Sequence, residues 1–329
     1  MNTNRGIRIL ALDGGGMRGL SELTILRQIC RSIFGDDNIE GTHKLFKSFD
    51  MICGTSTGSI ISVAMIKKSL QHCEDLYYQI GNDIFQSSIF YGPGRWLRYA
   101  TNGNYYDSNI LTNILEKDYG QETLNSVLGE DDPKMFITGT DATTNIFEPY
   151  LFRSYDNPNS RYHGCTDISL IQAVKASCSA PTYFSPVTFK DKLFVDGGFI
   201  YNNPTELAIY ESNHLWKNRE IECIVSIGSG LPKENQGAIN MFSLFGEIVD
   251  ICTNSNLIHQ RVLSLLDYTC QKPLYLRFNA PSPIGSIPLD CSDKSTLVKM
   301  CQDTAKYMEE MEQLEKIEKL KSVITIGIN

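Results

Sequence analysis

The feature that most constrains this chain is the segment 49–62, FDMICGTSTGSIIS, in which an apolar run stops abruptly at two glycines that flank a serine. The run 51–53 is typical of a buried strand, and the apolar positions that follow Gly58 have the spacing of a helix. This order predicts a strand, a tight turn and a helix, with Ser56 at the tip of the turn. The flanking glycines allow positive φ and close packing behind the serine, so we expect its hydroxyl to be exposed.

The same turn also has a simpler interpretation, because a G-x-S-x-G match can arise by chance in a turn before a buried helix. If the turn is instead a nucleophile elbow, the following helix directs free N–H groups and the positive end of its dipole toward Ser56. These residues alone leave both interpretations open.

The composition is that of an ordinary folded protein, with 329 residues, 42% hydrophobic and 21% charged. A net charge of −8 argues against a nucleic acid as partner, although local patches could still contact a membrane surface. The ten cysteines lack zinc-type spacing, the first residues MNTNRGIR form no hydrophobic leader, and the longest charge-free run is too short to span a bilayer. We therefore expect a cytoplasmic protein without metal or cofactor that binds membranes at most peripherally.

A second glycine-rich turn precedes the serine by about 40 residues. A predicted strand at 8–12 leads through Gly14, Gly15 and Gly16 into a predicted helix at about 20–34. Successive glycines between a strand and a helix can direct their N–H groups into one concavity that suits an anion. The turn could therefore be the oxyanion hole of the serine, with Arg18 either adding positive charge or lying solvated at the start of the helix.

The spacing of Gly14, Gly16 and Gly19 also matches the G-x-G-x-x-G pattern of dinucleotide-binding proteins. That function requires an acidic residue at the end of a second strand about 20 residues further on. Glu40 has this spacing, but it lies in the segment 35–41, which we predict to be a polar loop. The dinucleotide hypothesis is therefore the weaker one.

The remaining elements alternate between strands and helices, which predicts an α/β protein with a mainly parallel central sheet flanked by helices. Without a linker or repeat, we expect one domain over 1–329, in which 6–212 carries the motifs and 213–329 completes the fold. The aromatic segment 85–106, which includes Arg95 and Arg98, is either an interfacial flap or a packed connection. Further strands are predicted at 134–142, 148–153, 187–189, 193–195, 221–227 and 274–278, and helices at 71–84, 107–117, 167–176, 202–215, 241–266 and, long and charged, 294–323.

A serine needs a base at neutral pH. Of the five histidines, only His214 and His259 occupy the position along the chain that a triad of the α/β-hydrolase order requires, and both lie in helical patterns. Asp196 follows a predicted strand and precedes two glycines, so it is either a carboxylate that faces a ligand or an ordinary turn residue. We favour a Ser56–Asp196 dyad, which requires surroundings that raise the pKa of the carboxyl group.

Four motifs in this order, ILALDGGGMRGL, FDMICGTSTG, SCSAPTYFSP and VDGG, resemble the patatin-like phospholipase family. The nearer likeness is to the patatin domains of calcium-independent phospholipases A, and it covers roughly residues 6–204. The resemblance implies a patatin-like, three-layer α/β/α fold and calcium-independent hydrolysis of fatty acyl esters of glycerophospholipids. The site residues that it implies are the catalytic dyad Ser56 and Asp196 and an oxyanion hole of Gly14, Gly15, Gly16 and Arg18.

The expected partner is therefore a phospholipid or lysophospholipid at a membrane or micelle surface. Two other functions use the same residues. The protein could be an acyltransferase or a lysophospholipase, or it could be a lipid-binding module whose site is no longer catalytic. The intact serine and aspartate argue against the non-catalytic lipid-binding module.

Overall fold

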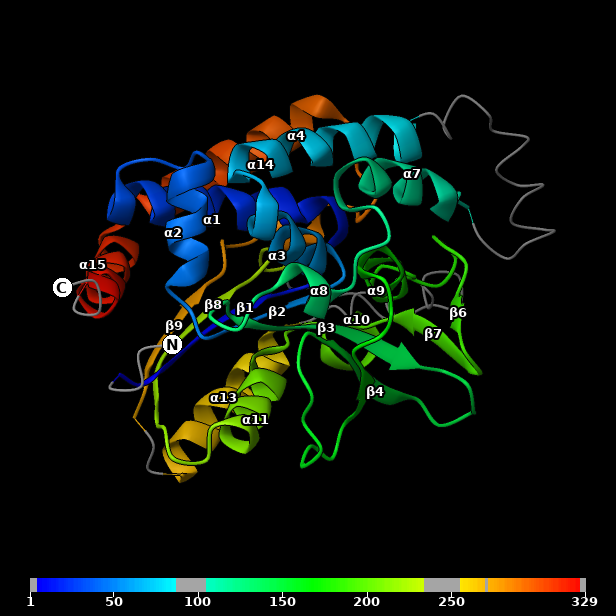
Figure 1. Cartoon of the computed structure of the whole chain (residues 1–329). Coiled ribbons are helices and arrows are strands. Elements are labelled where there is room, and N and C mark those ends of the chain that lie inside the picture. The colour runs from blue at the N-terminus through cyan, green and yellow to red at the C-terminus, as the bar shows by residue number, and fades with distance from the viewer. Residues whose placement is uncertain (1–4, 87–104, 234–254, 270–271, 326–329) are drawn as a thin grey trace.

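A nine-stranded sheet forms the centre of the protein (Figure 1). The computed structural model describes residues 5–86, 105–233, 255–269 and 272–325. The strands follow the order β5-β4-β3-β2-β1-β8-β9, and β7 pairs with both β3 and β6. They are β1 (Ile7–Leu12), β2 (Met51–Thr55), β3 (Lys134–Asp141), β4 (Glu148–Arg153), β5 (His163–Cys165), β6 (Val187–Phe189), β7 (Lys192–Asp196), β8 (Ile221–Ile227) and β9 (Leu274–Phe278).

The sheet is mainly parallel, which confirms the predicted fold class. Strands β3, β2, β1, β8 and β9 run in the same direction, whereas β4 and β7 are antiparallel to β3. Parallel neighbours end at the same edge of a sheet, and ligands of such sheets bind at that edge. The turns that follow β1 and β2, which carry the two glycine motifs, are therefore neighbours.

Helices cover both faces of the sheet. Figure 1 shows α1, α3, α4 and α14 on one face and α11 and α13 on the other. None of the helices that the structure describes combines the length and the apolar composition needed to cross a bilayer. The helices are α1 (Gly19–Phe34), α2 (Ile39–Lys47), α3 (Thr57–Lys67), α4 (Leu70–Ile80), α7 (Ser108–Tyr119), α8 (Leu124–Val127), α9 (Leu170–Ser177), α10 (Gly198–Tyr201), α11 (Thr205–Leu215), α13 (Asn256–Tyr268), α14 (Lys294–Met308) and α15 (Met311–Thr325).

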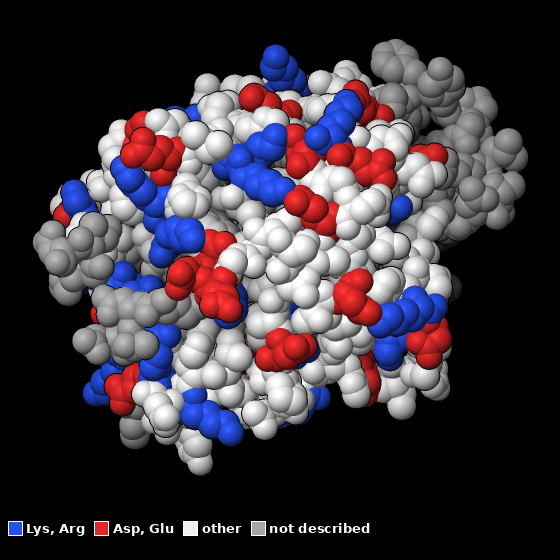
Figure 2. All heavy atoms as spheres, viewed as in Figure 1, with Lys and Arg blue, Asp and Glu red and all other residues white. Residues whose placement is uncertain are grey.

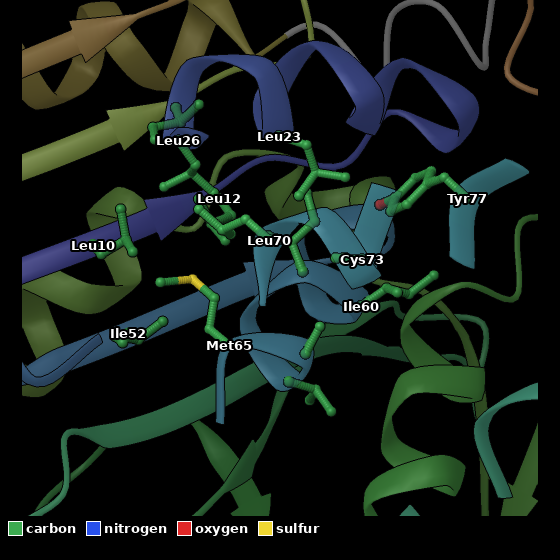
Figure 3. Close-up of a cluster of buried hydrophobic side chains, with 14 of the residues drawn as sticks. Leu10, Leu12, Leu23, Leu26, Ile52, Ile60, Met65, Leu70, Cys73 and Tyr77 are labelled. Atoms are coloured by element: carbon green, nitrogen blue, oxygen red, sulfur yellow. The ribbon is translucent and has the colours of Figure 1, made fainter. Parts of the chain in front are cut away.

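Each face of the sheet has its own apolar core, because successive side chains of a strand point to opposite faces. In β1, Leu10 and Leu12 join the larger cluster under α1, α3 and α4, part of which is drawn in Figure 3. Ile9 and Ala11 pack in the cluster on the side of α11 and α13. Burial on both faces explains why the central strands are almost continuously apolar in sequence.

Two sequence predictions of secondary structure are wrong. The segment 35–41 is not a loop throughout, since α2 begins at Ile39 and the Asn38 side chain caps it by accepting the N–H groups of Glu40 and Gly41. The predicted long helix 294–323 is two helices, because α14 ends at Met308 and α15 begins at Met311. The predicted helix 71–84 is confirmed, although its last residues belong to a π-helical turn (Gly81–Gln86) that follows α4.

Two predictions fall largely outside the described residues. Of the aromatic segment 85–106, only the two ends are described, and Arg95 and Arg98 are not among them. Of the predicted helix 241–266, the structure describes the part that belongs to α13.

Candidate active site

Ser56 lies at the tip of the turn between β2 and α3. Its backbone has φ 50° and ψ −119°, a strained conformation for a residue with a side chain, which costs about 1–3 kcal/mol. A Cβ atom added to Gly58 would lie 2.5 Å from the Asp13 carbonyl oxygen, so only glycine lets the turn pack against the neighbouring loop. The Ser56 N–H donates a 2.7 Å hydrogen bond to Ser177 Oγ, which fixes the turn from behind.

Asp196 is the last residue of β7, and its carboxyl group meets the serine directly. Ser56 Oγ donates to Asp196 Oδ2 at 2.9 Å, and the Gly198 N–H donates to Oδ1 at 2.7 Å. Burial raises the pKa of Asp196 to about 7, although the hydrogen bonds from Gly198 and Ser56 act in the opposite direction. A carboxylate with a pKa near neutrality, in contact with a hydroxyl group, has the properties of a general base.

Histidines take no part in this site. All five lie in described parts of the chain, and none lines the cavity that contains Ser56. The two candidates from the sequence have partners elsewhere: His214 Nδ1 pairs with the Tyr210 carbonyl oxygen at 2.8 Å and His259 Nδ1 with the Tyr275 hydroxyl at 2.9 Å. A Ser-His-Asp triad is therefore excluded by geometry.

The glycine loop after β1 lines the same cavity as Ser56 through Gly15 and Gly16. The Gly14 N–H already donates to the Asn202 carbonyl oxygen at 2.9 Å, so it is not available to a ligand in this arrangement. Among the described residues, the amides of Gly15 and Gly16 have no hydrogen-bond acceptor. Gly16 has φ 57°, and a Cβ atom there would lie 2.4 Å from the Leu289 carbonyl oxygen, so both conformation and space require glycine.

Arg18 is buried instead of solvated. Its Nε donates to the Gly15 carbonyl oxygen at 3.1 Å, and Nη1 donates to the carbonyl oxygen of Gly285. These bonds tie the glycine loop to the segment after β9. Arg18 therefore positions the loop and places its positive charge behind the two glycine amides.

A buried ion pair between Asp13 and Arg277 anchors the start of the glycine loop. Arg277, on β9, donates from Nη1 to Asp13 Oδ1 at 3.0 Å and from Nη2 to Oδ2 at 2.5 Å. The same guanidinium group donates to the hydroxyl groups of Ser226 and Ser255, at 2.8 and 2.9 Å. Two charges this deeply buried are tolerated because each has its partner and further hydrogen bonds.

An apolar cavity opens beside the Ser56 hydroxyl. Together with the open space at its mouth it holds about 880 Å³ of empty space. Phe85, Tyr183 and Phe184 form much of one wall. The ring of Tyr106 packs against two of them, with its centre 4.8 Å from that of Phe85 and 5.9 Å from that of Phe184. The other apolar lining residues include Met17, Ile60, Ile80, Ile84, Leu111 and Leu289. An apolar chain fits this cavity better than a charged nucleotide.

The structure gives no support to the dinucleotide hypothesis. Glu40 is not at the end of a strand; it lies in the first turn of α2, exposed, and pairs with Lys44 at 2.6 Å. In the described parts of the chain, no group of three or more histidine, cysteine, aspartate or glutamate side chains could hold a metal ion.

Sequence reasoning missed three residues that hold the site together: Ser177, Asn202 and Arg277. Ser177 stands at the end of α9, inside a stretch of small residues that predicts only tight packing. Asn202 and Arg277 act on the glycine loop from positions 188 and 264 residues away along the chain. Only a resemblance that extended past residue 212 could have indicated Arg277.

The fold and the site define an α/β protein with a serine elbow paired to a buried aspartate beneath a glycine loop. Residues 10–209 match the family described as patatin-like phospholipase. Because this match covers more than half of the chain, the protein belongs to the patatin-like phospholipase family.

Known relatives share this region. The chain is 33% identical over 314 residues to human calcium-independent phospholipase A2-gamma, and the alignment covers 93% of this chain and 38% of that protein. It is 25% identical over 351 residues to phospholipase A I of Arabidopsis thaliana (90% and 26% covered). It is 33% identical over 211 residues to the cGAMP-activated phospholipase of Vibrio cholerae (62% and 57% covered). The chain thus spans less than two thirds of the length of each of these relatives.

Similar solved structures are more distant. Human GIVD cytosolic phospholipase A2 aligns with a TM-score of 0.49 and 10% identity, covering 97% of this chain and 60% of that one. VipD from Legionella pneumophila aligns with a TM-score of 0.46 and 12% identity, covering 96% and 67%.

Proposed function

We propose that this protein is a calcium-independent lipid acyl hydrolase that cleaves fatty acyl esters of glycerophospholipids with the dyad Ser56 and Asp196. The observation that carries the proposal is the 2.9 Å contact between Ser56 Oγ and Asp196 Oδ2 at the wall of an apolar cavity. Membership of the family and the names of the relatives, several of which are calcium-independent phospholipases, support the substrate class.

In the first half of the reaction, Asp196 removes the proton of Ser56 as Oγ attacks the ester carbonyl carbon. The negative charge that develops on the carbonyl oxygen is stabilised by the N–H groups of Gly15 and Gly16. When the ester C–O bond breaks, the leaving alkoxide takes the proton from Asp196. The products are an acyl-serine and a free lysophospholipid.

In the second half, Asp196 removes a proton from a water molecule, which attacks the acyl-serine carbonyl carbon. Collapse of the second tetrahedral intermediate returns the proton to Ser56 Oγ and releases the fatty acid. Arg18 and the Asp13–Arg277 pair keep the glycine loop in place throughout, because they bind its backbone and its first residue.

Two further features belong to this proposal. Strands β8 and β9 follow the family match but pair into the same sheet as β1, so we propose that 1–329 act as one catalytic domain. The eight cysteines that the structure describes all carry free thiols, which suits a reducing, cytoplasmic environment with peripheral access to membranes.

The test is incubation of the wild-type protein and Ser56→Ala with a mixed panel of phospholipids, lysophospholipids and glycerides in the presence of a chelator. We expect the wild type to release fatty acids and the variant, with unchanged circular dichroism, to release none. Transfer of the acyl group to an added alcohol or lysolipid in preference to water would identify an acyltransferase instead. Equal activity of the variant, or strict dependence on calcium, would contradict the proposal.

A further inference from the structure

An exposed apolar surface continues from the mouth of the catalytic cavity to the edge of the sheet. It consists of Ile146, Phe147, Leu193 and Phe199, which we call the apolar rim. Ile146, Phe147 and Leu193 are 68%, 48% and 37% exposed. Large apolar side chains are normally scattered singly on a protein surface, so a group of them beside a site is informative.

The apolar rim is physically joined to the catalytic cavity through Phe199. This residue, on α10, lines the cavity, and its ring packs edge-on against that of Phe147 with the ring centres 6.2 Å apart. Phe147 and Ile146 lie in the connection between β3 and β4. An apolar path therefore runs without interruption from the tip of this connection into the cavity.

The start of β7 supports the connection from the side. The Leu193 N–H donates to Thr143 Oγ1 at 2.9 Å, and its carbonyl oxygen accepts the N–H of Ala142 at 2.8 Å. In Figure 1 the β3–β4 connection and the β6–β7 turn lie together at the edge of the molecule where β3 ends and β7 begins, on the right of the view. Hydrogen bonds between the β3–β4 connection and β7 therefore hold the apolar rim in place.

The charges around the apolar rim do not suit an anionic partner. Lys192 pairs with Asp141 at 2.5 Å, and Lys190 pairs with Asp167 at 2.6 Å. Asp191 and Glu148 add two more carboxylates to the same region. Figure 2 likewise shows acidic and basic groups interspersed over the visible face instead of a basic patch. Attraction to anionic lipids requires such a basic patch.

We infer that the apolar rim docks on a zwitterionic lipid surface by inserting Ile146 and Phe147 between the head groups, which brings the mouth of the catalytic cavity onto the membrane. This inference rests on the proposed function, since the occupant of the cavity is then a lipid acyl chain that need not cross water. The binding is driven by burial of apolar surface and not by charge, so it is insensitive to salt.

The test separates binding from catalysis. In the Ser56→Ala background, which cannot consume the vesicles, phosphatidylcholine vesicles are floated with the protein and with the double variant Ile146→Ser, Phe147→Ser. We expect the double variant to bind at least about tenfold more weakly, because it no longer buries two large apolar side chains in the lipid. The matched control is Met311→Ser, Leu314→Ser on α15, whose side chains are 72% and 43% exposed at a distant part of the fold and should not matter.

A second measurement shows whether the site itself is intact. With Ser56 present, the double variant should hydrolyse a soluble short-chain ester as fast as the wild type. If neither protein hydrolyses that ester, the proposed function fails while the binding result still stands on its own. If the ester is hydrolysed but the double variant binds vesicles as tightly as its parent, or if binding requires anionic lipid and is lost in high salt, the docking surface is wrong.

Discussion

Asp196→Asn should make the protein more stable while it removes activity. In the fold, burial raises the pKa of this carboxyl group from 3.8 to about 7, which corresponds to about 4 kcal/mol of destabilisation once the group is ionised. An asparagine can keep both contacts, because Oδ1 can accept the Gly198 N–H and Nδ2 can donate to Ser56 Oγ. We expect the variant to be more stable than the wild type by roughly 2–4 kcal/mol above pH 7.

The stability difference between the variant and the wild type should depend on pH in a defined direction. Between about pH 4 and pH 7 the unfolded chain has lost the proton of Asp196 and the folded protein still holds it. The stability that this proton provides is complete below the pKa of the unfolded chain and is lost as the pH rises through the folded pKa. The difference in unfolding free energy between variant and wild type should therefore grow by about 1.4 kcal/mol per pH unit from pH 5 to pH 6.5 and level off above pH 7.5.

The assay is urea unfolding of both proteins at several pH values, followed by circular dichroism. Because only the difference between the two proteins is used, the other titrating groups cancel. Asp167→Asn is the control, since that carboxylate is exposed and paired with Lys190, and it should produce no such rise. A difference that stays flat between pH 5 and pH 8, or a variant less stable than the wild type at pH 8, would refute the reasoning.

Two further predictions concern the glycine loop. Arg277→Ala should lower the unfolding free energy by about 3–5 kcal/mol, because it leaves Asp13 buried without its partner. Lys44→Ala, which breaks an exposed pair with Glu40, should leave the unfolding free energy almost unchanged in the same urea titration. Gly16→Ala should lower kcat for a soluble ester by about 10²–10³, because the displaced loop loses an oxyanion donor. Gly35→Ala, with φ 88° and open space around it, should cost only the roughly 1–2 kcal/mol of its left-handed conformation and cause no loss of kcat. Equal kcat in both variants would count against the oxyanion hole.

The strands of the central sheet could be predicted well from the sequence because their signals are local. The apolar runs of β8 and β9 are bounded by polar or turn residues, and the structure places them at Ile221–Ile227 and Leu274–Phe278, as predicted. The elbow around Ser56 is also local, since a serine between glycines after a strand leaves little choice of conformation.

The errors arose where local signals mislead. Gly35, Asp36, Asp37 and Asn38 have the composition of a loop, and they hide the helix that Asn38 caps. The break between α14 and α15 contains no proline or glycine, and the apolar positions of the two helices continue in helical spacing across it. The end of α14 is instead set by packing, since both helices contact α1 but α15 also contacts β9.

The site residues divide in the same way. Ser56 and Asp196 could be proposed because each ends a strand beside glycines, but their contact across 140 residues is a property of the folded sheet. The raised pKa of Asp196 follows from burial, which no local pattern shows. For the same reason, the occupied amide of Gly14 and the role of Arg18 as a support of the loop became visible only in the structure.

The most direct test of the account is the rate at which a fluorophosphonate labels the protein between pH 5 and pH 9, with the labelled residue identified by mass spectrometry. If Asp196 activates the serine without a histidine, the label lies on Ser56 and the rate rises about tenfold per pH unit up to an apparent pKa near 7. Asp196→Asn should abolish this rise and nearly all of the labelling. Labelling at another residue, or a variant that reacts as fast as the wild type, would contradict the account.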